Sequence, residues 1–299
     1  MGLKILNFGS LNLDYVYSVD HIVAPGETIS STGLDIFPGG KGLNQSVALA
    51  RAGAEVYHAG MVGRDDGELL LQTCKENRID TSLIQRTEVR SGNAIIQIAT
   101  GGENSIVLFG GANRQNTVAR VDAVLSRFGK GDLLLLQNEV NLLDYTIEKA
   151  YAMGMEIALN PSPFDDGLQR CDFSKVSFLF INEVEGEQLS GEKQPERILA
   201  FIRKTYPNMQ TILTLGKDGA CVQRGDLIYH QAVFDTNVVD TTAAGDTFTG
   251  YFLTEITHGQ SPQDALRHAT AAASLAVSRK GAVTSIPWRH EVEGLLGGL

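Results

Sequence analysis

The residues best suited to chemistry lie in one segment, Asp240-Thr241-Thr242-Ala243-Ala244-Gly245-Asp246-Thr247-Phe248. It begins a predicted helix over 243–257, and the small residues at 243–245 leave backbone N–H groups open at the positive end of that helix, where an anion can bind. Asp246, in the same turn, can accept a proton from a hydroxyl that attacks a phosphate. Acidic residues in a first helical turn also commonly stabilise the helix end, so the segment alone leaves both interpretations open.

A glycine-rich segment near the start, Phe37-Pro38-Gly39-Gly40-Lys41-Gly42-Leu43-Asn44-Gln45, opens a second predicted helix that ends at Gly53. It is not a P-loop, because glycine and not Ser or Thr follows Lys41. It is not a dinucleotide fingerprint, because Gln45 stands where a glycine is required. A lysine and an asparagine among glycines suit the binding of hydroxyls. The alternative is a tight turn with a solvated lysine.

Asn12 and Asp14 follow the first predicted strand, where ligands bind in open α/β sheets. An Asn-x-Asp pair can hold two neighbouring hydroxyls. A polar turn is the alternative interpretation.

Short apolar runs alternate with amphipathic segments, which predicts a parallel sheet with helices on both faces in one α/β domain over 1–299. Residues 13–36 and 92–108 carry β-type patterns without a helix between them, and we expect a small antiparallel sheet that acts as a lid. An edge extension of the main sheet is the alternative. The predicted strands are 5–8, 56–61, 133–136, 157–159, 178–181 and 212–215, and the predicted helices are 42–52, 66–77, 117–127, 142–153, 193–205, 243–257 and 262–279.

Composition excludes several classes of function. The net charge is −10 and no basic stripe is present, so a nucleic-acid partner is not expected. The three cysteines match no disulfide or metal spacing and are expected to be buried thiols. No apolar run is long enough for a membrane span or a signal peptide, and the expected location is the cytoplasm.

The two signatures, at 39–45 and 240–248, resemble those of the ribokinase or PfkB family of carbohydrate kinases, and the similarity extends over nearly the whole chain. The resemblance implies an ATP-dependent kinase that phosphorylates the primary hydroxyl of a small sugar, with ribose as the expected acceptor. It further implies Mg²⁺, a monovalent cation such as K⁺, and a homodimer formed through the lid strands.

The resemblance also implies residue roles. Asp246 would be the base, beside an anion hole at Ala243, Ala244 and Gly245. The sugar would be held by Asn12, Asp14, Gly40, Lys41, Gly42, Asn44, Glu139 and Asp246. The nucleotide would be bound by Asn182, Thr214, Leu215, Gly216, Lys217, Asp218, Gly219, Gly245 and Thr270. Glu185 would order Mg²⁺ through water, and the monovalent cation would be held at Asp240, Thr242, Ala276, Arg279, Gly281 and Ser285, mostly through backbone carbonyls.

Three positions depart from the family pattern. Thr270 stands where a histidine often lies near the adenine, with His268 two residues earlier, and Leu43 and Asn93 are unusual near the expected sugar pocket. The acceptor therefore stays open between ribose, deoxyribose, a nucleoside, fructose and fructose phosphate. A catalytically silent sugar-binding protein is the alternative from another class, and a nicotinamide-dependent dehydrogenase is disfavoured by the missing fingerprint.

Overall fold

The computed structural model describes residues 3–298, and its main feature is a nine-stranded sheet in the order β13-β12-β11-β10-β9-β8-β1-β4-β5. The strands from β11 to β5 pair in parallel, and β12 and β13 continue the sheet as an antiparallel hairpin. All six strands predicted from the sequence are present. The strands are β1 (Ile5–Phe8), β4 (Val56–Gly63), β5 (Asp80–Thr87), β8 (Leu133–Gln137), β9 (Glu156–Asn160), β10 (Phe178–Asn182), β11 (Gln210–Thr214), β12 (Ala220–Arg224) and β13 (Leu227–Gln231).

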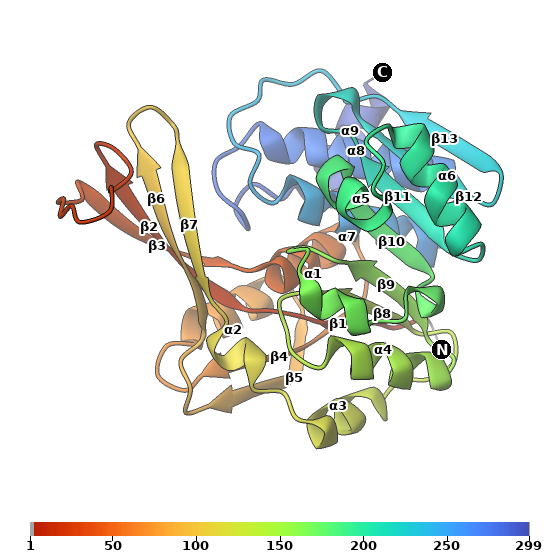
Figure 1. Ribbon diagram of the computed structural model, residues 1–299, viewed down its shortest axis with the longest axis horizontal. Coiled ribbons are helices and arrows are strands. Elements are labelled where there is room, and N and C mark those ends of the chain that lie inside the picture. The colour runs from red at the N-terminus through yellow and green to blue at the C-terminus, as the bar shows by residue number, and fades with distance from the viewer. Residues whose placement is uncertain (1–2, 299) are drawn as a thin grey trace.

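Helices cover both faces of this sheet, as the alternating pattern predicts, and all seven predicted helices are present within two residues of their expected ends (Figure 1). The α-helices are α1 (Lys41–Ala52), α2 (Glu68–Glu76), α3 (Val118–Leu125), α4 (Leu143–Ala152), α5 (Glu183–Ser190), α6 (Pro195–Thr205), α7 (Ala244–Thr257), α8 (Pro262–Val277) and α9 (Arg289–Gly297). Short 3₁₀ turns are η1 (Gly111–Arg114), η2 (Asp166–Arg170), η3 (Phe173–Lys175) and η4 (Gly216–Asp218).

The strands are buried on both faces because alternate side chains enter two different cores. In β8, Leu133 and Leu135 pack with α1, α2, α7 and α8, whereas Leu134 and Leu136 pack with α3, α4 and α6. This explains why the strands appear in the sequence as continuous apolar runs. The three cysteines are buried free thiols in these cores, as expected.

A separate four-stranded sheet projects from the main body, in the order β3-β2-β6-β7 (Figure 1, left). Its strands are β2 (Asn12–Val19), β3 (Gly33–Gly39), β6 (Gly92–Ala99) and β7 (Asn104–Phe109). The lid sheet predicted from the sequence is therefore confirmed, and an edge extension is excluded. The expectation that it is antiparallel is wrong, because β2 and β6 pair in parallel and join two antiparallel pairs. These two strands both leave the main sheet in the same direction, so they can only align in parallel.

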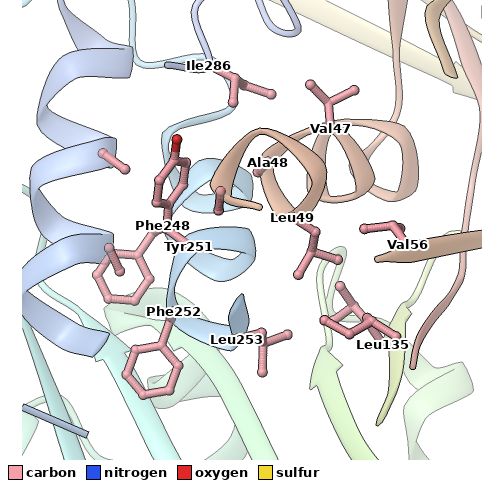
Figure 2. Packing of buried hydrophobic residues seen from close by; sticks show 14 of the residues in the cluster. Val47, Ala48, Leu49, Val56, Leu135, Phe248, Tyr251, Phe252, Leu253 and Ile286 are labelled. Atoms are coloured by element: carbon pink, nitrogen blue, oxygen red, sulfur yellow. The ribbon is translucent and has the colours of Figure 1, made fainter. Parts of the chain in front are cut away.

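The helices that begin with the two signatures, α1 and α7, lie side by side in one core (Figure 2). A Cβ at Gly250 would lie only 2.4 Å from the Cβ of Ala48, so glycine allows the two helices to approach closely. Val47 and Leu49 of α1 and Tyr251 and Leu253 of α7 are fully or almost fully buried around this contact. The packing brings the beginnings of the two helices together, although they are about 200 residues apart in sequence.

Among residues 3–298, no helix combines the length and apolarity that crossing a membrane requires.

Candidate active site

The two signatures meet at the carboxylate of Asp246. Asn44 Nδ2 donates to Asp246 Oδ2 at 3.0 Å, and Gln45 Nε2 donates to Asp246 Oδ1 at 2.9 Å. Asp246 itself is only 7% exposed. Both carboxylate oxygens therefore have one amide donor each, and each retains a lone pair that can accept a further proton.

The start of α7 presents backbone amides beside this carboxylate. Ala243 precedes the helix in a left-handed conformation with φ +59°, and the Ala244 N–H makes only a long bond of 3.3 Å to Thr241 O. Within the described chain, the amides of Gly245 and Asp246 have no backbone partner. The turn thus has the open N–H groups that an anion needs at a helix N-terminus.

The start of α1 is held by a buried carboxylate. Gly40 has φ +90°, a conformation that favours glycine, and it directs the Lys41 N–H to Glu139 Oε2 at 3.1 Å. The hydroxyl of Ser10 also donates to Glu139 and accepts from the Gly42 N–H at 3.1 Å. Glu139, which follows β8, therefore fixes the glycine loop against the end of β1.

Asp14 and Asn12 reach the same region from the lid strand β2. Burial, and secondarily the Glu139 carboxylate, raises the pKa of Asp14 to about 7. Asn12 is 6% exposed, and its Oδ1 accepts from Asn113 Nδ2 at 2.7 Å. The lid thus contributes one carboxyl and one oriented amide to the site.

Lys41 supplies the positive charge of the site. Burial by itself would lower the pKa of this lysine, but the Asp246, Glu139 and Glu185 carboxylates outweigh burial and raise it. Burial also raises the pKa of Glu139, and the Lys41 charge opposes that rise. The lysine is therefore a stable cation among three carboxylates.

A cavity of about 250 Å³ lies next to Asp246 and extends toward α5. Asn182 and Glu185 line it at the start of α5, where they form a capping box: Glu185 N–H donates to Asn182 Oδ1 at 2.9 Å, and Asn182 N–H donates to Glu185 Oε2 at 3.0 Å. Glu185 therefore stabilises its own helix and also faces the cavity. The other lining residues are Lys41, Asn160, Ser162, Phe180, Ile181, Thr214, Thr241, Ala243, Ala244, Gly245, Asp246, Phe248 and Thr249.

A second, more apolar cavity of about 520 Å³ adjoins the first at Asn182, Thr214 and Gly245. Of the residues expected at a nucleotide, Gly216, Lys217, Gly219 and Thr270 also line it. Leu215 packs instead against the core on the other face of the sheet, and Asp218 is not among the lining residues. His268 is half-buried on α8 and contacts Asp264 O; Thr270 and not the histidine lines the cavity.

The two segments expected to hold a monovalent cation lie together. Asp240 Oδ1 accepts from the N–H and the hydroxyl of Thr242, and its Oδ2 accepts from the Gly281 N–H at 2.9 Å. These bonds outweigh burial and lower the pKa of Asp240. The carboxylate thus joins Thr242 to Gly281 and closes the loop, and the backbone carbonyls of the loop are available as further ligands. Arg279 directs its side chain to Glu291 at 2.7 Å, and Ser285 is fully buried and donates to Ala282 O.

Neither of the unusual residues near the expected sugar pocket faces it. Leu43 is 0% exposed within the core of α1 and α7. Asn93 pairs with Leu13, whereas its neighbour Ala94 pairs with Asp14, so Asn93 lies on the opposite face of the lid sheet. Both side chains therefore point away from the expected sugar pocket.

Sequence reasoning missed several polar residues of this region. Ser10 orients the Glu139 carboxylate, and Asn113 orients Asn12. Gln45 contacts Asp246. Asn160 ends β9 and lines the smaller cavity beside Lys41. The position of Asn160 at the carboxyl end of a parallel strand was a usable signal, the same one that indicated Asn12.

A lid sheet over a parallel α/β body, with a buried carboxylate at an amide-rich helix start and a basic glycine loop opposite, defines a sugar-phosphorylating class of enzyme. The family model of the pfkB family carbohydrate kinases matches residues 3–289, and the chain belongs to this family.

The relatives that it matches over nearly their whole length include ribokinases, and a deoxyribokinase of Salmonella typhi is among the more distant ones. The chain is 36% identical to the ribokinase of Haemophilus influenzae over 294 residues, which cover 95% of each chain. The crystal structure of the Thermotoga maritima ribokinase superposes with a TM-score of 0.88 at 33% identity and 99% coverage of both chains. The Arabidopsis thaliana ribokinase complexed with ribose and ATP superposes with a TM-score of 0.86 at 28% identity, again with 99% coverage of both chains.

Proposed function

We propose that this carbohydrate kinase transfers the γ-phosphate of ATP to the primary hydroxyl of ribose, with Asp246 as the general base. The observation that carries the proposal is the contact between Asn44 of the glycine loop and Asp246 at 3.0 Å, beside the open amides of α7. Ribose as the acceptor and ATP as the donor are supported by the Arabidopsis relative that binds both.

The sugar fits between the lid and the glycine loop. Asn44 donates through Nδ2 to Asp246, while its Oδ1 is buried and has no partner among the described residues. A buried acceptor without a donor is costly, and a sugar hydroxyl would satisfy it. Asp14 and Glu139 are carboxyl groups that can accept from further hydroxyls. The donor set therefore suits a polyol whose reactive hydroxyl points to Asp246.

The nucleotide fits along the two adjoining cavities. The larger, apolar cavity next to Thr270 suits an adenine ring, and the smaller cavity with Lys41 and Gly245 suits the phosphates. This arrangement directs the terminal phosphate to the amides at the start of α7. The reacting atoms would then lie between Lys41 and Asp246.

The residues also fit the two expected cations. Mg²⁺ bound with ATP is usually held by phosphate oxygens, waters and one or two carboxylates, so the lack of a cluster of three or more ligating side chains in residues 3–298 is compatible with it. Glu185 faces the cavity and would order the ion through water, and the ion would neutralise phosphate charge. K⁺ would be held by the carbonyls of the loop that Asp240 closes.

In the reaction, Asp246 accepts the proton of the primary hydroxyl while the oxygen of that hydroxyl bonds to the γ-phosphorus. The bond between that phosphorus and the bridging oxygen of ADP breaks at the same time, so ADP leaves with the electron pair. Lys41 and the amides of Gly245 and Asp246 stabilise the charge on the transferred group. Closure of the lid excludes water, which would otherwise accept the phosphate.

The acceptor is tested by ADP release with ribose, deoxyribose, a nucleoside, fructose and fructose phosphate, each with and without K⁺. We expect the highest kcat/KM for ribose and a higher rate with K⁺. A nucleoside or deoxyribose with a clearly higher kcat/KM would overturn the ribose assignment, and sugar binding without any ADP release would support the silent binding protein.

We also propose that the active protein is a homodimer joined through the lid. On the lid face opposite to Asp14, the strand register brings together apolar side chains of β3, β6 and β7, here called the outer lid face: Leu34, Ile36, Ile95, Val107 and Phe109. They are between 45% and 63% exposed. A contiguous apolar surface of this kind indicates an interface, and the lid of a second copy offers a matching one.

A further inference from the structure

A chain of buried amides connects the glycine loop to the catalytic carboxylate. Gln137 Nε2 donates to Gln45 Oε1 at 2.6 Å and to Asn7 Oδ1 at 3.0 Å, and Asn7 Nδ2 donates to Gly42 O at 2.7 Å. Gln45 Nε2 completes the chain at Asp246 Oδ1. Asn7, Gln45 and Gln137 are all 0% exposed.

Both ends of this chain accept hydrogen bonds and cannot donate them. A carbonyl at Gly42 and a carboxylate at Asp246 each require an amide NH₂ group, so the orientation of every amide between them is determined. If Gln45 were flipped, its oxygen would face the carboxylate and its NH₂ group would face that of Gln137. The network therefore allows only one arrangement, in which Gln45 directs N–H at Asp246.

This arrangement has a cost that packing alone does not explain. Gln137 Oε1 is buried without a hydrogen-bond partner among the described residues. The Gln137 amide is nevertheless required, because an apolar side chain there would leave the buried oxygens of Gln45 and Asn7 without their donor.

We propose that Gln45 is a positioning residue of the phosphoryl transfer: oriented by Gln137, it holds the Asp246 carboxylate aimed at the sugar hydroxyl. The inference rests on the proposed role of Asp246 as base. Asn44 supplies the other amide donor but also faces the sugar site, whereas Gln45 lies behind the carboxylate and acts only through it.

The charged groups around Asp246 are Lys41 at the start of α1, Glu139 after β8, and Glu185 at the start of α5 across the same cavity. A change of Gln45 to an apolar residue leaves all three in place. Any change in the pH dependence of the reaction then reports the lost N–H donor and not an altered set of charges.

The test is the Gln45→Met substitution, which keeps the side-chain length and removes the donor. We expect kcat to fall about tenfold or more, because a hydrogen bond to a charged group is lost, while KM for ribose changes less than about threefold. The acidic limb of the kcat/KM profile should move to higher pH, because a hydrogen bond that favours a charged carboxylate is lost.

Thr254→Val is the matched control. Thr254 is fully buried in α7, donates to Gly250 O at 2.8 Å, and makes no hydrogen bond to the amide chain or to Asp246. This variant should lower the melting temperature without moving the pH profile. If Gln45→Met does not fold, Gln137→Met is the second test. Without the Gln137 amide, the Gln45 side chain can rotate away from Asp246, so the pH profile of kcat/KM should move in the same direction.

An unchanged pH profile in the folded Gln45→Met protein, or an equal shift in Thr254→Val, overturns the inference. Asp246→Asn separates this failure from that of the proposed function. If Asp246→Asn is inactive while Gln45→Met keeps the wild-type profile, only the positioning role is wrong. If Asp246→Asn is active, the base assignment itself is wrong.

Discussion

At the scale of single residues, the site is a small set of carboxyl groups with different environments. Asp246 is held by two amide donors, Glu139 is fixed under the glycine loop, and Asp14 is desolvated on the lid strand. These differences suit different tasks. A general base must be ionised to accept a proton. A carboxyl that binds sugar hydroxyls can be desolvated in the empty protein, because the bound sugar then supplies hydrogen bonds.

Asp14 gives the empty protein a pH-dependent stability. Its pKa rises from an ordinary 3.8 to about 7 on folding, so the folded state binds the proton more tightly and stability falls as pH rises between these values. We expect Asp14→Asn to remove on the order of 1 kcal/mol or more of this decline. Urea unfolding at pH 5 and pH 8, compared with the exposed Asp35→Asn control, measures it, and equal slopes in all three proteins would contradict the assignment.

At the scale of elements, two contacts determine the geometry of the site. The glycine contact at Gly250 lets α1 and α7 pack closely, and the parallel pairing of β2 with β6 places Asn12 and Asp14 over the start of α1. Any movement of the lid therefore also moves Asn12 and Asp14. Its exposed apolar face makes the lid the part of the chain whose behaviour depends most on a second copy.

Charge on the outer lid face should break the proposed dimer. The double substitution Ile95→Lys and Val107→Lys places two like charges where two apolar surfaces would meet, which is strongly unfavourable. We expect the wild-type protein to have twice the monomer mass of 32.3 kDa by light scattering, and the variant to be monomeric. Leu227→Lys, equally exposed on β13, is the control. A monomeric wild type, or a dimer that survives the double substitution, would contradict the proposal.

At the scale of the whole molecule, the parallel body could be predicted because its strands are continuous apolar runs such as Leu133–Leu136. The strands β5 and β13 were missed because they lie at the two sheet edges, where exposed polar residues interrupt the apolar pattern; β12, between β11 and β13, is buried but has only three apolar residues in a row. The helix α5 was missed because it is short and weakly amphipathic, although Asn182 and Glu185 form a recognisable capping box.

The residues of the site likewise fall into those that could be predicted from the sequence and those that could not. Motif residues such as Lys41 and Asp246 stand in local patterns that indicate ligand binding, so they could be selected from the sequence. Gln137 ends a parallel strand and so carried the same signal as Asn160, but the partners of Gln137, Ser10 and Asn113 lie about 90 to 130 residues away and no local pattern indicates them. Such contacts exist only once the sheet has brought the strand ends together.

The central claim is that the Asp246 carboxylate takes the proton from a sugar hydroxyl held by the opposite helix start. Single-turnover phosphorylation of ribose by Asp246→Asn tests it most directly, with calorimetric binding of ribose and ATP as the check that the site is intact. Asp144→Asn, in the first turn of α4, is the matched control. We predict that Asp246→Asn binds both ligands normally and reacts at least about 10²-fold more slowly. A phosphorylation rate close to that of the wild type would contradict the claim.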